Sequence, residues 1–229
     1  PLGVVVISKD ITQRKRMEER ESFLSSLLRH DVKNKIHTAD GYLDLIDDAD
    51  CSPETASHLE TATRALSGAL ELIEQITMLS DLAHEEVDVW NLQSVLNDVV
   101  ESHASQAAAE GGDLSYNGCE GSVRGGPLLE ALFGNLITNA LKHSNADTIA
   151  VTCRRETDEH VVVVADDGDG IQAEAATQLL EEGVSKGDSA GTGLGLYLVD
   201  QIARSYGGHI ELGDSADGGL RVAVHLQAV

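Results

Sequence analysis

NLITNALK, at residues 135–142, is the stretch of sequence that decides the fold expected for the second half of this chain. On a helix Asn135, Asn139 and Lys142 lie at positions i, i+4 and i+7, so they share one face. Amide oxygens are hard ligands that suit Mg²⁺, and an ammonium group is a point charge for phosphate oxygens. The pattern indicates a helix that faces a metal-bound polyphosphate, although an ordinary polar helix surface would have the same spacing.

Two glycine-rich stretches follow this helix. VVVVADDGDGI, residues 161–171, reads as a strand that runs into a tight turn, where Gly168 and Gly170 permit the close approach of a flat ligand. Asp166 ends the strand and can accept a hydrogen bond from an exocyclic amine. GTGLGL, residues 191–196, precedes a helix, so its backbone N–H groups favour an anion at the helix N-terminus. Each stretch on its own also fits a turn that binds nothing.

In this order and spacing the three stretches resemble the Bergerat-type ATPase superfamily, and specifically the catalytic domain of sensor histidine kinases, over residues 85–229. The resemblance implies ATP and Mg²⁺ as cofactors, with Asn135 and Asn139 as the N box, Asn139 as the metal ligand and a mobile lid above the phosphates. Many relatives have phenylalanines in the lid, whereas here it reads EEGVSKG, residues 181–187. The expected nucleotide contacts are Asn135, Asn139, Lys142, His143, Asp166 (to the adenine amine), Gly168, Gly170, Lys186, Gly191, Thr192, Gly193, Leu194 and Gly195.

FLSSLLRHDVKNKI, residues 23–36, carries a candidate phosphoacceptor. His30 lies about 180° from the mean direction of the apolar stripe, at about 100° per residue, so it faces outward. A neutral imidazole nitrogen can attack phosphorus, the adjacent Asp31 can orient the ring and accept its proton, and Asn34 can hold the phosphorylated ring or an attacking water. HDVKN resembles the H box of the same kinases, although Lys35 replaces a common proline. Read alone, the HDVKN stretch also fits an ordinary surface histidine beside an aspartate.

Apolar residues in steps of three and four predict two long helices joined by a turn that ends at Pro53. An antiparallel hairpin leaves its apolar stripes half exposed, so we expect it to dimerise into a four-helix bundle. The predicted fold class is α+β, with this hairpin followed by an α/β sandwich ATP-binding domain of Bergerat type. The stripes consist of Leu24, Leu28, Val32, Ile36, Ala39, Leu43 and Ile46, and of Leu59, Ala62, Leu66, Ala69, Ile73, Ile76 and Leu79.

Four segments are predicted along the chain. Residues 1–12 resemble the tail of a PAS sensor domain, because Asp10, Ile11 and Thr12 match its exit motif, and the charged residues 13–22 resemble a helical signalling linker. The dimerisation and phosphotransfer hairpin covers 23–84, and the catalytic domain covers 85–229. Within the catalytic domain we expect helices at 91–109, 127–143, 173–180 and 194–206, and strands at 87–89, 114–116, 122–124, 148–154, 160–166, 209–213 and 220–226.

The composition narrows the class of protein. The 229 residues include 39 acidic and 16 basic side chains, for a formal net charge of −23, which excludes nucleic acid as a partner and indicates adaptation to a salt-rich, halophilic cytoplasm. An ordinary acidic protein is the alternative.

No apolar run approaches the roughly 20 residues that span a bilayer. Three cysteines lie far apart, without a CxxC pair, so we expect a reducing compartment, no disulfide and no zinc site.

The sequence therefore predicts a cytoplasmic, homodimeric two-component sensor histidine kinase. We expect autophosphorylation of His30 by ATP and transfer of the phosphoryl group to an aspartate in a response-regulator receiver domain. Two alternatives stay open: a degenerate, non-catalytic dimer that docks a receiver domain, and a Bergerat ATPase of the chaperone or DNA-repair type that forms no phosphohistidine.

Overall fold

A computed structural model describes residues 32–43, 53–82, 85–109, 111–144, 146–170 and 194–229. The chain divides into two compact units, Pro1–Ile76 and Thr77–Val229, and each unit is described by itself. The predicted PAS-like tail, the signalling linker and the short helix at 173–180 lie outside the described residues. Among the helices that are described, none combines the length and the apolar character that crossing a membrane would need.

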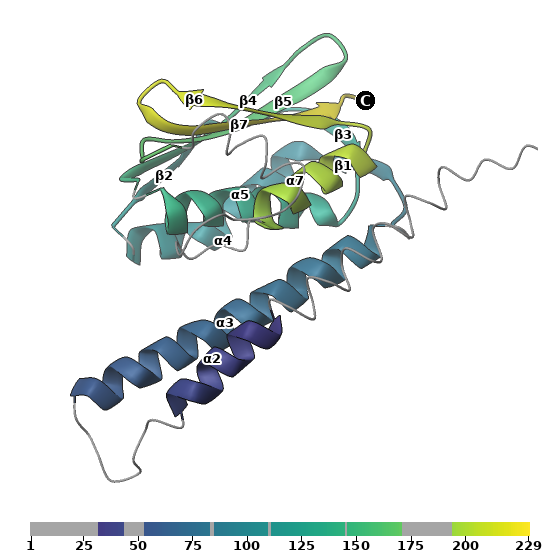
Figure 1. The fold of residues 1–229 in the computed structure, drawn as a ribbon. Helices are drawn as coiled ribbons and strands as arrows, with labels where there is room; N and C mark the ends of the chain where they lie inside the picture. Colours follow the sequence, from purple (N-terminus) through teal and green to yellow (C-terminus); the bar gives the residue numbers. More distant parts are fainter. Residues whose placement is uncertain (1–31, 44–52, 83–84, 110, 145, 171–193) are drawn as a thin grey trace, which may run out of the picture. The chain divides into compact units, whose positions relative to one another are not determined.

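The first unit contains an antiparallel helical hairpin of α2 (Lys33–Leu43) and α3 (Pro53–Asp81). The Tyr42 ring lies 5.5 Å from the His58 ring, centroid to centroid, while Lys35 reaches the backbone of Gly68. The residue numbers rise along α2 as they fall along α3, so the helices run in opposite directions (Figure 1). Pro53 opens α3 as predicted, at a position where its missing N–H costs no hydrogen bond.

The hairpin buries only part of its predicted apolar stripes. Ala39, Ala62 and Ala69 are buried, as are Leu72, Ile76 and Leu79 further along α3. Other apolar side chains of the same two helices stay between 43% and 62% exposed, namely Ile36, Leu43, Leu59, Leu66, Leu70 and Ile73. A single copy of the hairpin therefore leaves an apolar surface uncovered.

The second unit is a five-stranded sheet in the order β2-β4-β5-β7-β6, and the helices that the structure describes in this unit cover one face of it (Figure 1). Strands β2 and β4 are parallel, and every other pair in this sheet is antiparallel. A separate two-stranded sheet pairs β1 with β3. The bounds are β1 Asp88–Asn91, α4 Leu92–Ala109, β2 Asp113–Tyr116, β3 Ser122–Gly125, α5 Leu128–His143, β4 Thr148–Arg155, β5 Glu159–Asp166, α7 Leu194–Ser205, β6 His209–Ser215 and β7 Gly218–Gln227. The predicted α+β fold class is confirmed.

The core lies between the sheet and these helices. Alternate residues of β5 and β7 face it, because side chains of a strand point to opposite faces in turn. Helix α5 contributes Phe133, Leu129 and Leu132, none of which has exposed surface, and α7 contributes Leu198 and Ile202. Truncating such a side chain to alanine costs about 2–5 kcal/mol, so the helix faces that carry the sequence motifs are firmly positioned.

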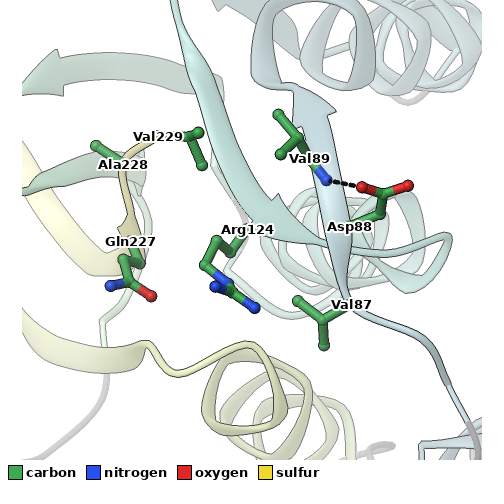
Figure 2. A pocket seen from close by; sticks show the side chains of 7 residues that line it. All are labelled: Val87, Asp88, Val89, Arg124, Gln227, Ala228 and Val229. Carbon is green, nitrogen blue, oxygen red and sulfur yellow. Dashed lines mark hydrogen bonds between the residues drawn. The ribbon is translucent and has the colours of Figure 1, made fainter.

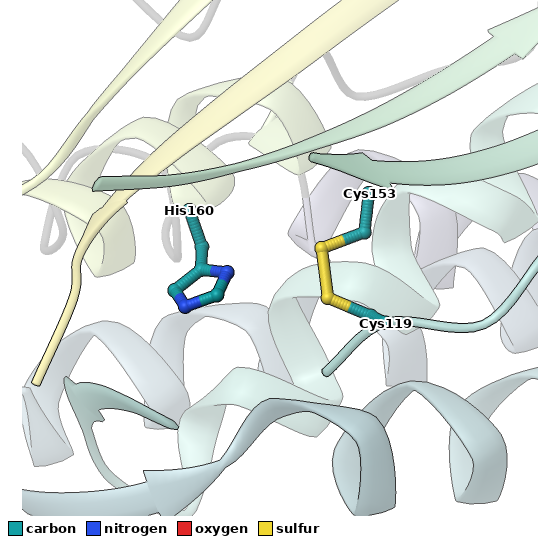
Figure 3. A group of neighbouring side chains, drawn as sticks. All are labelled: Cys119, Cys153 and His160. Atoms are coloured by element: carbon teal, nitrogen blue, oxygen red, sulfur yellow. A yellow bond between two sulfur atoms is a disulfide. The ribbon is translucent and has the colours of Figure 1, made fainter. Parts of the chain in front are cut away.

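The structure joins Cys119 to Cys153 in a disulfide, with the two Cα atoms 5.4 Å apart (Figure 3). The prediction that the chain has no disulfide was therefore wrong. The reason is the parallel pairing of β2 with β4, which aligns Tyr116 with Val151 and so brings the segment after β2 to the C-terminal half of β4. Because the two cysteines are 34 residues apart in the sequence, their spacing does not indicate that they lie close together in the fold.

Candidate functional site

Helix α5 presents the predicted N-box residues on one partly exposed face. Asn135 and Asn139 are half-buried, and Lys142 is exposed near the C-terminal end of the helix. Asn135 Nδ2 donates a 2.7 Å hydrogen bond to the carbonyl of Ala131, one turn earlier, which holds the amide against its own helix. His143 is the last residue of α5, and its side chain lies outside the description.

Gly195, in the first turn of α7, packs directly on the Asn139 amide. A Cβ atom at Gly195 would lie 2.9 Å from Asn139 Nδ2 and 3.0 Å from Oδ1, closer than side chains normally approach one another. Glycine at this position therefore leaves the space beside α7 that the Asn139 amide occupies. Two of the three motifs, far apart in the sequence, thus meet at the N-terminus of one helix, where the helix dipole favours negative charge.

The third motif is a turn held by Asp166 at the end of β5. Asp166 is 5% exposed, and its Oδ1 accepts hydrogen bonds from the backbone N–H groups of Gly168 at 3.0 Å and Leu220 at 3.2 Å. Gly168 lies against the carbonyl of Ser144 with no room for a Cβ atom, and Gly170 has a positive φ of 68°. The carboxylate is therefore fixed at the junction of β5, β7 and the end of α5.

Asp167 fastens the same turn to the neighbouring strand. Its Oδ1 accepts a 2.9 Å hydrogen bond from the Thr148 N–H at the start of β4. This bond is the main cause that lowers the pKa of Asp167 below its ordinary value, so the carboxylate stays ionised. In the sequence, Asp167 is indistinguishable from the other acidic residues of the turn.

A buried contact that the sequence does not predict joins Tyr206 to Glu85. The Tyr206 hydroxyl donates to Glu85 Oε2 at 2.6 Å, and Glu85 Oε1 accepts from the Leu128 N–H at 3.2 Å, at the start of α5. Burial and the Glu85 carboxylate raise the pKa of Tyr206, which keeps its proton. Glu85 therefore connects the segment before β1 to the helix that carries the N box and to the end of α7.

The remaining predicted residues are placed only in part. Asn34 is exposed on α2, and its backbone carbonyl accepts a 2.8 Å hydrogen bond from the Thr38 hydroxyl. Leu194 is buried at the start of α7. His30, Asp31, Lys186, Gly191, Thr192 and Gly193 lie outside the described residues.

A pocket at the β1–β3 end of the domain contains none of the predicted residues (Figure 2). Figure 2 shows Val87, Asp88 and Val89 on one side, with Arg124 of β3 between them and the end of the chain. The Val89 N–H donates to the Asp88 carboxylate at 2.7 Å, so this carboxylate binds its own strand. The predicted nucleotide motifs lie elsewhere, where α5, α7 and the turn after β5 meet.

Comparison with known proteins identifies the type of the sheet domain. Residues 126–229 match the family model described as "Histidine kinase-, DNA gyrase B-, and HSP90-like ATPase". The chain is 24% identical, over 98% of its length, to the sensor protein SrrB of Staphylococcus aureus, and it spans 41% of the length of that relative. The chain is thus homologous to sensor proteins, and the match continues through the hairpin as well as the sheet domain.

Solved structures agree on the fold. The histidine kinase AdeS of Acinetobacter baumannii superposes with a TM-score of 0.66 at 18% identity, covering 87% of this chain and 98% of that one. The ATP-binding domain of PrrB from Mycobacterium tuberculosis gives a TM-score of 0.53 at 23% identity, covering 63% of this chain and 99% of that one. The sheet domain therefore has the fold of histidine kinase catalytic domains.

Proposed function

We propose that this chain is the core of a two-component sensor histidine kinase, on the premise that residues 126–229 form an ATPase domain of the histidine kinase type. In the proposed reaction ATP phosphorylates His30, and the phosphoryl group then passes to an aspartate of a response-regulator receiver domain. The observation that best supports it is the packing of Gly195 on Asn139, because it sets an amide ligand beside a helix N-terminus suited to phosphates.

In the proposed nucleotide site Asn139 contributes an amide oxygen to Mg²⁺, and Asn135 and Lys142 lie on the same helix face. Mg²⁺, when bound, neutralises charge on the phosphate oxygens. Asp166 accepts a hydrogen bond from the adenine amine, and its two backbone donors support this role because they fix the carboxylate before the ligand arrives. The other proposed contacts are His143, Gly168, Gly170, Lys186, Gly191, Thr192, Gly193, Leu194 and Gly195.

In the proposed transfer step a neutral ring nitrogen of His30 attacks the γ-phosphorus as the bond to the leaving ADP oxygen breaks. Asp31 orients the ring and takes the proton from its other nitrogen. Asn34 then holds the phosphorylated ring, and its exposed position on α2 supports access by a partner protein. A receiver aspartate then attacks the phosphorus as its bond to the His30 nitrogen breaks, and Asp31 returns the proton, so the imidazole is neutral again.

Dimerisation through the hairpin completes the proposal. The six exposed apolar side chains of α2 and α3 support it, because contiguous apolar surface of this kind marks an interaction site. A second copy of the hairpin would cover them in a four-helix bundle. We assign the kinase to the cytoplasm and residues 1–12 to the end of a PAS-like sensor domain, as the sequence predicts.

The proposal is tested by incubating the chain with γ-labelled ATP and Mg²⁺ in molar KCl. We expect acid-labile label on the wild type, none on His30→Ala or Asn139→Ala, and retained nucleotide binding in His30→Ala. His37→Ala is the matched control, since His37 is an exposed histidine of α2, and it should label normally.

Three outcomes would contradict the proposal. Label that persists in His30→Ala would show that His30 is not the phosphoacceptor. ATP hydrolysis without any label on the protein would favour an ATPase of the chaperone or DNA-repair type. A wild type without Mg²⁺-dependent ATP binding would point to the non-catalytic scaffold, a reading that the unusual lid sequence EEGVSKG favours.

A further inference from the structure

We propose that the sheet face opposite the helices carries a binding site for a divalent transition-metal ion of the Zn²⁺ class, where His209, His225, Glu159 and Glu211 meet. The first three offer ligand atoms that all lie within 4.8 Å of one another. Two imidazoles with the Glu211 carboxylate form the mixed nitrogen and oxygen donor set that such ions prefer, and Glu159 orients the His225 ring.

Strand register brings the four side chains together. His209 of β6 and His225 of β7 are directly paired across the strands, and their rings stack with centroids 4.2 Å apart. Glu211 follows His209 by two residues on β6, and Glu159 is the diagonal neighbour of His225 on β5, where Val161 pairs with His225. Opposite and diagonal positions on one sheet face are the positions from which long side chains reach one another.

The distances between polar atoms fit an ion better than they fit direct bonds. His225 Nε2 is 3.6 Å from Glu211 Oε2, and His209 Nε2 is 4.0 Å from Glu211 Oε1. Both separations exceed those of a hydrogen bond. Two ligands of a tetrahedral ion, each about 2.1 Å from it, lie about 3.4 Å apart, so a small adjustment of exposed side chains would close this set around an ion.

A buried, unpartnered nitrogen is the independent observation that points to a ligand. His225 is 8% exposed, and its Nε2 is buried without a hydrogen-bond partner in the part of the chain that the structure describes. Its other nitrogen, Nδ1, lies 3.0 Å from Glu159 Oε2. Because a carboxylate only accepts hydrogen bonds, Nδ1 is the donor to Glu159, and in the neutral tautomer that makes this bond Nε2 carries the lone pair, which is the arrangement that orients histidine ligands in metal sites.

The site is open at one side and electrostatically suited to a cation. The side chains of Glu159, Glu211 and His209 are 42%, 58% and 48% exposed, which leaves an entry path from solvent to His225. Two carboxylates balance the charge of one divalent ion, and the net charge of −23 raises the local concentration of cations. A second group of potential ligands consists of Cys119, Cys153 and His160, but the two cysteine sulfurs are bonded to each other (Figure 3).

This site is separate from the proposed nucleotide site. Leu220, whose N–H donates to Asp166, and His225 lie five residues apart on β7, which corresponds to about 17 Å along a strand. His225 also faces away from the helices, because its neighbours Val224 and Leu226 point into the core. Occupancy would connect β5, β7 and β6 and so stabilise the sheet.

Calorimetric titration of the 229-residue chain with ZnCl₂, without nucleotide or reductant, tests the site. We expect one equivalent to bind, with affinity lowered at least tenfold in His209→Ala and Glu211→Gln and about 10–100-fold in Glu159→Gln. These three side chains are between 42% and 58% exposed and make no part of the core, so their variants keep the fold, and His103→Ala of α4 is the matched histidine control. CoCl₂ should give the visible absorption of a nitrogen-ligated ion in the wild type and not in His209→Ala.

The proposal would be overturned if His209→Ala and Glu211→Gln had the same zinc affinity and cobalt absorption as the wild type. It would also be overturned if the wild type bound no equivalent of zinc. The readout needs neither ATP nor His30, so failure of the kinase proposal would leave this result unaffected. Conversely, His209→Ala should autophosphorylate like the wild type.

Discussion

The hydroxyl of Tyr206 donates a 2.6 Å hydrogen bond to Glu85, and the same carboxylate accepts the Leu128 N–H through its other oxygen. Tyr206 is 3% exposed, so the bond is made in a region from which water is largely excluded. It connects the end of α7 and the start of α5 through one acidic side chain. The two helices that carry the N box and the GTGLGL motif are therefore held together at the end remote from Gly195.

Replacing Tyr206 with phenylalanine should destabilise the chain. The variant leaves Glu85 Oε2 without its donor, while Oε1 keeps the Leu128 N–H. Hydrogen bonds to charged groups contribute about 1.5–3 kcal/mol, so we expect a loss of that order in the free energy of unfolding. Urea unfolding followed by circular dichroism measures it. Tyr116→Phe is the matched control, because the buried Tyr116 hydroxyl has no partner among the described residues and its removal should be neutral or stabilising. Equal losses in both variants would contradict the assignment.

The same pair predicts an effect at alkaline pH. The raised pKa of Tyr206 means that the folded chain holds the phenol proton more tightly than the unfolded chain does. The stabilisation from this pair is therefore complete below the tyrosine pKa of the unfolded chain, about 10, and is lost as the pH rises above it. We expect the difference in unfolding free energy between wild type and Tyr206→Phe to be constant from pH 7 to 9 and to shrink above pH 10. A difference independent of pH would show that folding does not raise the pKa of this phenol.

Periodic segments of this chain were predictable, and contacts between distant strands were not. The helix expected at 127–143 is observed at Leu128–His143, because apolar spacing reports which face of a single element is buried. Strand β7 begins at Gly218, two residues before the predicted start, since glycine carries no apolar signal although it pairs in the sheet. Alternation along a strand identifies its faces but not its neighbours.

The candidate site divides in the same way. Asn139, Asp166 and Gly195 were predicted from local motifs, because each belongs to a stretch with a characteristic spacing or glycine, and the structure brings Asn139 and Gly195 together. Glu85 and His225 were missed, since their meaning depends on partners 121 and 66 residues away. His225 was interpreted from the sequence as a surface or packing residue, and only the pairing of β6, β7 and β5 reveals what surrounds it.

Gly195→Ala should separate nucleotide binding from stability. The new methyl group would lie 2.9 Å from Asn139 Nδ2, so the amide must move away from its position beside α7. We expect at least a tenfold loss of Mg²⁺-dependent ATP affinity in a fluorescence titration. Stability should be retained, because alanine is favoured over glycine within a helix by about 1 kcal/mol. Gly213→Ala is the control, since its Cβ would be 3.9 Å from the nearest atom, and ATP affinity equal in both variants would contradict the role of this contact.

The net charge of −23 predicts a dependence on salt. Exposed carboxylates repel one another over the Debye length, which falls from about 10 Å at 0.1 M to about 3 Å at 1 M salt. Few cations compensate locally, because Arg64, Arg154 and Arg204 already pair with Glu60, Glu156 and Asp200. We therefore expect both the melting temperature and autophosphorylation to rise between dilute buffer and molar KCl.

The double variant Asp98→Asn, Glu101→Gln, at exposed positions of α4, tests whether repulsion between exposed carboxylates causes the salt dependence. It removes two negative charges and no described ion pair, so its melting temperature in dilute buffer should exceed that of the wild type, while the two should converge in molar KCl. NaCl should act like KCl, since screening depends on ionic strength, and sucrose at equal osmolarity should leave the difference between the two proteins unchanged. A wild type that is equally stable and active in dilute buffer would show that self-repulsion does not limit this fold.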